Sequence, residues 1–300
     1  MEKKVILEIK NVSKSFGKSK IIDNINLKVN EGEIYGFVGP NGAGKTTTIK
    51  MILGLLSIDE GSISINGYDV KKKFEKAMEY IGGIVENPDM YGYMSGLDNL
   101  KLYAKIRNIK KERIDEVVEL VGLTSRIKDK VQKYSLGMKQ RLGLALTLLH
   151  NPKVLILDEP TNGLDPAGIK DLRNLLKKIS HKEGVAVFVS SHMLAEMEQM
   201  CDVITVINKG KIIETKNIKD VLTQKEDIVE YILEVKPEEK MLELVEGSEL
   251  VEGKIHVKIK SEEMPKLVRK LVKEKIDIYE ITAKNSTLEE AFFDITGGEK

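Results

Sequence analysis

The chain has 300 residues, of which 41% are hydrophobic and 32% charged, so it can form one large domain with a buried core and a smaller second domain. Its 48 lysines and arginines nearly cancel its 47 aspartates and glutamates, which excludes a chain-wide field that would attract nucleic acid or an anionic membrane. We therefore expect no nucleic-acid partner, and the single cysteine, Cys201, excludes an internal disulfide framework.

Two strand patterns in the first 220 residues predict two sheets. Apolar and polar residues alternate at residues 25–29 and 63–65, which is typical of a half-exposed antiparallel sheet. Later strands are apolar almost throughout, at residues 154–157, 185–189 and 203–207. This second pattern favours parallel strands covered by helices on both faces. No apolar run reaches the roughly 18 residues of a membrane span, and the first residues contain no signal-peptide core, so we expect neither.

The middle and the end of the chain show different patterns. Residues from about 87 to 150 have helical spacing, with a stop predicted at Gly122, so we expect an inserted helical subdomain. After residue 220 the pattern restarts and predicts a small α+β domain at 221–300, with a first domain at 1–220. The elements expected in the small domain are a strand at 228–235, a helix after 237, a strand at 255–259, a helix at 262–275, a strand at 276–283 and a terminal helix at 288–295.

A glycine-rich octapeptide, GPNGAGKT, lies between an apolar run at 34–38 and a helical stretch at 47–56. Glycines permit positive φ and a close backbone approach, so that successive N–H groups and a helix N-terminus can point at phosphates. Lys45 would bridge the β- and γ-phosphates, and the Thr46 hydroxyl would bind Mg²⁺. The strand-loop-helix setting argues against a chance glycine-rich turn, so we predict a site for a nucleoside triphosphate. Its residues are Gly39, Pro40, Asn41, Gly42, Ala43, Gly44, Lys45, Thr46 and Thr47.

Two adjacent carboxylates, Asp158 and Glu159, follow the apolar run at 154–157. Open α/β sheets bind their ligands at this end of their strands. Asp158 would hold Mg²⁺, and Glu159 could polarise an attacking water as general base. A solvated acidic turn is the alternative, and the presence of Lys45 in the same chain argues against it.

A further motif, beginning Tyr134-Ser135-Leu-Gly137-Met, starts a predicted helix about ninety residues after Lys45. Together with the phosphate loop, the carboxylate pair, Asn162-Gly-Leu-Asp165 and Ser190-Ser-His192, it resembles the ATP-binding subunit of ABC transporters. The ordered motifs cover roughly residues 16–192. The resemblance implies an α/β phosphate-loop ATPase core with an N-terminal antiparallel β-subdomain and the inserted helical subdomain, and it implies ATP and Mg²⁺ as ligands.

The resemblance also implies a head-to-tail dimer of two copies of the chain. Each ATP would lie between the phosphate loop of one copy and a helix start of the other, and a helix N-terminus favours the negative charge of a γ-phosphate. Asp165 would lie at the contact between the copies. The residues of that helix start are Ser135, Leu136, Gly137 and Met138.

Three single residues receive roles from the same resemblance. His192 would reach the γ-phosphate and join Lys45 and Glu159 as a catalytic residue, although a lone histidine after a strand is more often a surface residue. Phe16 would stack on adenine, or else belong to the core. Glu86 stands where the family usually has a glutamine that contacts Mg²⁺ and the membrane partner. Because a carboxylate adds a charge and loses a donor, we predict Glu86 as a metal and coupling residue.

We predict the ATPase subunit of an exporter that powers efflux of a peptide antibiotic or another drug through a separate permease, at the inner face of the cell membrane. Pro88, Tyr91 and the variant residues Leu136 and Met138 are similar to the bacitracin-export and lantibiotic-immunity branch. Neutral drift within generic exporters is the alternative for those residues. The rival functions are an importer ATPase and a non-transport ATPase acting on ribosomes or DNA. A single cassette without room for a coiled-coil arm argues against the latter.

Overall fold

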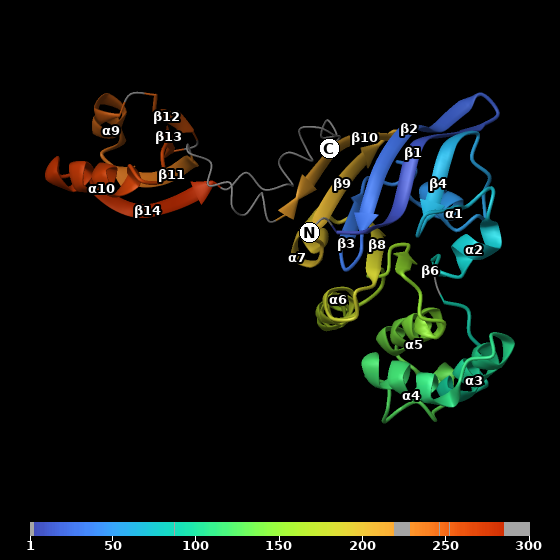
Figure 1. Ribbon diagram of the computed structural model, residues 1–300. Coiled ribbons are helices and arrows are strands. Elements are labelled where there is room, and N and C mark those ends of the chain that lie inside the picture. Colours follow the sequence, from blue (N-terminus) through green and yellow to red (C-terminus); the bar gives the residue numbers. More distant parts are fainter. Residues whose placement is uncertain (1–2, 87, 219–228, 246, 252, 285–300) are drawn as a thin grey trace. The chain divides into compact units, whose positions relative to one another are not determined.

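The computed structural model describes residues 3–86, 88–218, 229–245, 247–251 and 253–284. The chain divides into two compact units, and the division falls after Ile218. Each unit has a hydrophobic core of its own. Figure 1 shows the helices and strands of both units. The boundary predicted at residue 220 lies outside the described residues.

The first sheet of the larger unit is antiparallel and has the strand order β2-β1-β4-β5. Along β2, Ile25, Leu27 and Val29 are buried and the residues between them are exposed. The predicted alternation is therefore confirmed, and it turns one face of this sheet to the core. The strands are β1 (Val5–Phe16), β2 (Ser19–Asn30), β4 (Glu60–Ile65) and β5 (Tyr68–Asp69).

The second sheet has the order β10-β9-β3-β8-β7-β6, and all neighbours pair in parallel except the hairpin of β9 and β10. Every residue of β3, β7 and β8 is buried, which confirms the interpretation of the continuous apolar runs. Because these three neighbours are parallel, their carboxyl ends meet at one edge of the sheet. The strands are β3 (Ile34–Val38), β6 (Ile81–Ile84), β7 (Val154–Leu157), β8 (Ala186–Ser191), β9 (Val203–Asn208) and β10 (Lys211–Asn217).

Different layers cover the two faces of the six-stranded sheet. Phe37, Ile156 and Phe188 share one core with the first sheet and with α1 (Lys45–Ile52). Helices α6 (Pro166–His181), α7 (Leu194–Met200) and the short α2 (Phe74–Met78) complete this part of the unit, and α6 and α7 pack on the sheet. The prediction of helices on both faces was thus wrong in part, because one face is covered by α1 together with the first sheet.

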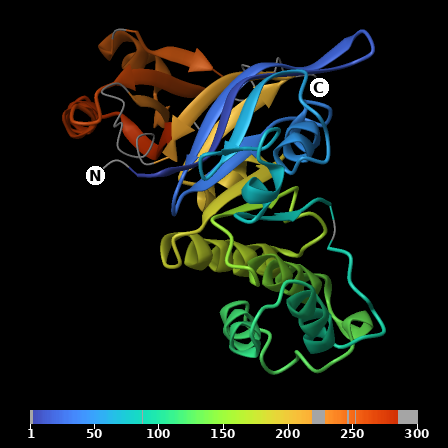
Figure 2. The ribbon, with the colours of Figure 1, turned by 45° about the vertical axis from the view of Figure 1, so that its right-hand side comes forward.

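Three helices form a lobe beyond β6 and contact one another (Figure 2). They are α3 (Gly96–Ile106), α4 (Lys111–Leu120) and α5 (Leu136–Leu148), with a 3₁₀ turn at Val131–Lys133 before α5. Gly122 has a φ of 70° just after α4, as the predicted helix stop requires. Within the described ranges, no helix combines the length and the apolar character that crossing a membrane requires.

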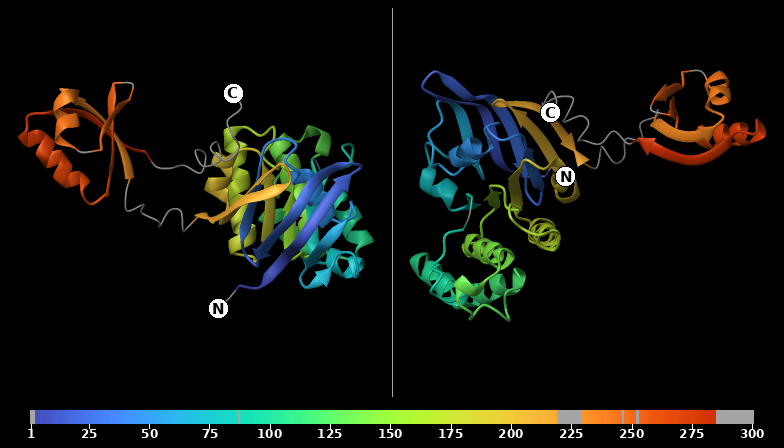
Figure 3. Two further views of the ribbon diagram at one scale, coloured as in Figure 1. Left: turned by 90° about the horizontal axis from the view of Figure 1, so that it is seen from above. Right: turned by 180° about the vertical axis from the view of Figure 1, so that it is seen from behind.

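The smaller unit is a four-stranded antiparallel sheet in the order β12-β13-β11-β14 (Figure 3). Leu233 and Val257 of the sheet share a core with Met241 and Leu271 of the two helices, so both helices cover the same face. The predicted order is confirmed with one strand added, β12, and the predicted helix at 288–295 lies outside the described residues. The elements are β11 (Val229–Lys236), α9 (Glu238–Leu244), β12 (Glu249–Val251), β13 (Lys254–Ile259), α10 (Met264–Lys273) and β14 (Asp277–Lys284).

Candidate nucleotide-binding site

The glycine-rich loop joins the end of β3 to the start of α1. A Cβ at Gly39 would lie 2.3 Å from the Ile207 carbonyl oxygen, and Gly44 has a φ of 108°, so both positions require glycine. The helix begins at Lys45 and ends at Ile52, two residues earlier than predicted at its start and four at its end. Gly54, with a φ of 68°, accounts for the early end. The first N–H groups of α1 therefore emerge at the loop, where an anion is favoured.

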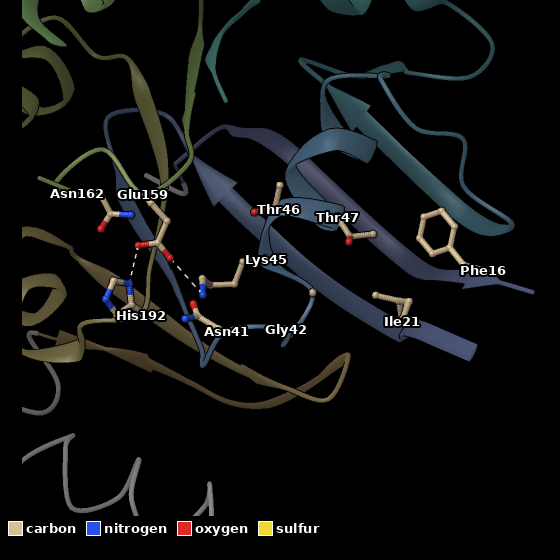
Figure 4. Close-up of a pocket in the computed structure, with 11 residues that line it drawn as sticks. Phe16, Ile21, Asn41, Gly42, Lys45, Thr46, Thr47, Glu159, Asn162 and His192 are labelled. Carbon is tan, nitrogen blue, oxygen red and sulfur yellow. Dashed lines mark hydrogen bonds and ion pairs between the residues drawn. The ribbon is translucent and has the colours of Figure 1, made fainter. Parts of the chain in front are cut away.

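Lys45, Glu159 and His192 are brought together from three separate segments (Figure 4). The Lys45 side chain is 6% exposed, and its ammonium group donates to the Gly39 carbonyl at 2.7 Å and lies 3.2 Å from Glu159 Oε1. The other carboxylate oxygen of Glu159 is 2.9 Å from His192 Nδ1. The carboxylate thus links the lysine to the histidine, and the three residues predicted as catalytic share one site.

A cavity of about 570 Å³, the lysine cavity, contains this trio. Phe16 lies at its edge and is 51% exposed, so its ring can be covered by a flat ligand. The Lys14 ammonium is 5.5 Å from the centre of the Phe16 ring and 2.7 Å from Asp59 Oδ1. This hydrogen bond, with that from the Ser15 amide, lowers the pKa of Asp59. The lining residues are Phe16, Ile21, Asn41, Gly42, Gly44, Lys45, Thr46, Thr47, Glu159, Asn162 and His192.

The predicted metal ligands are only partly assembled. Thr46 lines the lysine cavity, and Asp158 is 2% exposed at the end of β7. These are a hydroxyl and a carboxylate oxygen, which are donors that suit Mg²⁺. Glu86 is exposed, has a φ of 62° and does not line this cavity, so its metal role stays a prediction. Among the described residues, no group of three or more His, Cys, Asp or Glu side chains is placed to hold a metal ion.

A second cavity of about 550 Å³, the serine cavity, is lined by the predicted helix-start residues and by Asp165. The predicted loop residues Gly39, Pro40 and Ala43 line neither cavity. Ser135 caps α5 and accepts from the Met138 amide at 3.3 Å. Asp165 caps α6 in the same way and accepts from the Gly168 amide at 2.9 Å. Ser135, Leu136, Gly137, Met138 and Asp165 line the serine cavity, and none of them lines the lysine cavity. A single chain therefore divides the predicted site in two.

The sequence analysis did not predict three residues that line or support the lysine cavity. Asn162 and Ile21 line the cavity, and Ser190 lies behind it, where its hydroxyl contacts Asp158. Asn162 belongs to the same sequence motif as Asp165, and Ser190 to the same motif as His192, so their positions in the sequence could have identified both as site residues. Nothing in the sequence distinguished Ile21 from an ordinary strand residue.

Comparison with known proteins shows what the chain is similar to. The family model described as ABC transporter matches residues 22–162. The chain is 48% identical over 300 residues to YhcH of Bacillus subtilis (strain 168), described as an uncharacterized ABC transporter ATP-binding protein, with 99% of this chain and 98% of that protein covered. It is 40% identical to the bacitracin transport ATP-binding protein BcrA of Bacillus licheniformis, with 98% of each covered. The lantibiotic transport ATP-binding protein SrtF of Streptococcus pyogenes is 42% identical, with 70% of this chain and 90% of that protein covered.

Solved structures agree with the fold of the larger unit. The structure of cbiO1 from Clostridium perfringens, part of the ABC transporter complex cbiONQ, is matched with a TM-score of 0.68 and 27% identity, covering 75% of this chain and 93% of that one. The ADP conformation of MJ1267, an ATP-binding cassette of an ABC transporter, is matched with a TM-score of 0.65 and 27% identity, covering 73% of this chain and 95% of that one. The predicted fold class is thereby confirmed.

Proposed function

This chain belongs to the family of ABC transporter ATP-binding proteins, and from that premise we propose that it powers export of a peptide antibiotic or another drug through a separate membrane-spanning permease. Members of the family bind and hydrolyse ATP, so the chain is an ATPase. The transport names of its relatives favour transport over action on ribosomes or DNA. The similarity to bacitracin and lantibiotic transport proteins favours export over import.

The observation that carries the mechanism is the division of the predicted site between two cavities. We propose that two copies meet head to tail, so that the lysine cavity of one faces the serine cavity of the other. The α5 N-terminus, capped by Ser135, would then face the γ-phosphate held by Lys45, where its dipole favours negative charge. Asp165, at the start of α6, would lie between the copies.

Within the lysine cavity each side chain has a chemical task. Lys45 would neutralise charge on the phosphates, in place of its present pairing with Glu159. Glu159, once released from Lys45, would accept a proton from the attacking water, and His192 would hold the carboxylate from its other side. Thr46 and Asp158 would hold Mg²⁺. The ion would supply neutralisation of the charge that develops on the phosphate oxygens.

We propose that the permease docks where the helical lobe meets β6, and that it holds the chain at the inner face of the membrane. A groove of about 410 Å³ runs between β6, α3 and α5, lined in part by Pro88, Tyr103 and Ile106. Tyr91 and Tyr93 lie, like Pro88, on the connection between β6 and α3, with 47% and 69% of their surfaces exposed. Exposed aromatic and apolar side chains of this kind mark protein-protein contacts.

Glu159→Gln tests the assigned chemistry. The amide cannot accept the proton, so ATP hydrolysis should fall by roughly 10²- to 10⁴-fold while ATP binding is kept and the nucleotide-bound dimer accumulates. Glu79→Gln is the matched control, because Glu79 is 56% exposed and pairs with Lys76 on the surface. Size-exclusion chromatography with ATP and a phosphate-release assay provide both measurements. Hydrolysis at the parent rate would show that the general base lies elsewhere.

Transport is tested in cells that express this chain together with the protein of the neighbouring reading frame. A neighbouring reading frame with roughly six hydrophobic spans would support the proposal, and a ribosomal or repair neighbour would count against it. The pair should raise resistance to a bacitracin-like peptide, and Glu159→Gln should abolish that resistance.

Glu86→Gln examines the predicted coupling role. Unchanged ATPase activity, unchanged Mg²⁺ dependence and full resistance in that variant would remove Glu86 from the site.

A further inference from the structure

Ser190 lies on β8, directly behind the two carboxylates of the proposed site. Its side chain is fully buried, and its hydroxyl donates to Asp158 Oδ1 at 2.7 Å. The Ser190 hydroxyl oxygen also accepts a hydrogen bond from the Glu159 backbone amide at 3.0 Å. A hydroxyl has one donor and can accept in addition, so these two bonds use it consistently. One side chain thus contacts both residues to which the ATPase chemistry is assigned.

The backbone at Glu159 is held in an unusual conformation. Its φ is 48°, which is the left-handed region that non-glycine residues rarely adopt. Such a conformation persists only where the surroundings fix it, and the bond from the Glu159 amide to Ser190 is one such restraint. The Asp158 amide on the other side donates to the Ile84 carbonyl at 3.0 Å. The bend at this point directs the Glu159 side chain to Lys45 and His192.

We propose that Ser190 is a positioning residue that fixes the Asp158 carboxylate for Mg²⁺ and the Glu159 carboxylate for the attacking water. The proposal rests on the function proposed above. A hydrogen bond to a buried carboxylate is charge-assisted, and such supporting partners orient a metal ligand. Removal of the hydroxyl leaves the Asp158 oxygen and the Glu159 amide without this partner in a dry environment, so both groups turn toward other partners.

The expected consequence concerns Mg²⁺ and kcat rather than ATP affinity. In Ser190→Ala, kcat should fall by roughly 10- to 100-fold and the Mg²⁺ concentration at half-saturation should rise by about tenfold. The KM for ATP should change little, because the loop from Gly39 to Thr46 is untouched. Ser190→Thr keeps the hydroxyl and suits a strand, so it should restore the Mg²⁺ dependence.

Thr205→Val is the matched control. Thr205 is also fully buried in the same sheet, and its hydroxyl contacts the Tyr35 hydroxyl at 2.5 Å and the Thr215 hydroxyl at 2.7 Å. Its loss should lower the melting temperature without changing the Mg²⁺ dependence. A loss of stability alone is thereby separated from a loss of positioning.

The experiment uses the full chain and two readouts. ATP hydrolysis is measured across a Mg²⁺ titration, and binding of a fluorescent ATP analogue is measured across the same titration at a temperature below every melting point. A higher Mg²⁺ requirement in both readouts for Ser190→Ala, with recovery in Ser190→Thr, supports the proposal. A folded Ser190→Ala protein with the parent kcat and Mg²⁺ requirement overturns it, as does an activity loss without any Mg²⁺ shift. Glu159→Gln is run alongside, because the parent rate in that variant would overturn the general base assigned under the proposed function, whereas the Ser190 variants test the positioning alone.

Discussion

The lysine cavity and the serine cavity are similar in volume but are organised differently. In the lysine cavity, the bonds join distant segments, with Lys45 and Glu159 separated by more than a hundred positions in the sequence. In the serine cavity, Arg141 pairs with Asp171, but the two capping side chains act locally. Ser135 and Asp165 each accept from an amide three residues further along their own helix. One chain can therefore organise charge in the first cavity, whereas the second presents helix starts that suit a ligand brought by another surface.

Among the variants that distinguish the two cavities, the largest effect is expected from Lys45→Met, which removes the cation from the lysine cavity. Hydrolysis should fall by about 10²- to 10³-fold, as for loss of one charge-stabilising donor, and binding of a fluorescent ATP analogue should weaken by at least tenfold in the same cavity. Lys50→Met is the control, because Lys50 lies in the last turn of the same helix and does not line the cavity. Unchanged nucleotide binding in Lys45→Met would show that the lysine cavity does not hold the phosphates.

Much of this comparison could be predicted from sequence, because each half of the site is encoded locally. The glycine loop, Asp158 and the cap at Ser135 are short motifs whose structures follow from neighbouring residues. The strand β6 was missed because Gly82 and Gly83 interrupt its apolar run, and β12 because its three residues are all exposed. The partition into two cavities depends on how the lobe packs on the sheet. No local spacing reports this packing, and the partition was predicted only through the resemblance to the family.

A smaller effect is expected from Ser135→Ala, which alters the serine cavity alone. ATP binding to the isolated chain should stay within about twofold of the parent, because the lysine cavity is intact, while hydrolysis should fall by about 10- to 100-fold. Loss of the cap should also lower the free energy of unfolding by about 1 kcal/mol. Ser95→Ala separates the two effects: Ser95 caps α3 through the Asp98 amide at 3.0 Å and lies outside the serine cavity.

Mixing the two variants sharpens the comparison further. In a head-to-tail dimer, one Lys45→Met chain and one Ser135→Ala chain form one site with both residues intact and one site that lacks both. The mixture should therefore hydrolyse ATP faster than the average of the separate variants, up to the contribution of one site per dimer. Hydrolysis at that average rate across a wide range of mixing ratios would contradict the proposed arrangement of the two cavities.

The smallest effect concerns His150, which lies just beyond α5 and so secures the far end of the helix that presents the serine cavity. His150 Nε2 is 2.8 Å from the Ile81 carbonyl oxygen of β6. Burial lowers the pKa of His150, and Arg107 and Arg113 act in the same direction, while the bond to Ile81 opposes them. Because the folded pKa lies below the unfolded one, the unfolded chain binds more protons, and this contribution to stability is lost as the pH falls below about 6.5.

The pH effect is measured by urea unfolding of the parent and of His150→Gln at pH 7.5 and pH 5.5. The glutamine does not titrate, so the parent should lose more stability between these two values than the variant does. His181→Gln is the control for the loss of a histidine elsewhere in the same unit, since His181 is 43% exposed and is paired with Asp202 instead of a backbone carbonyl. Equal losses of stability in the parent and in His150→Gln would mean that other titrating groups cause the loss at low pH. The contact between α5 and β6 would then not depend on a neutral His150.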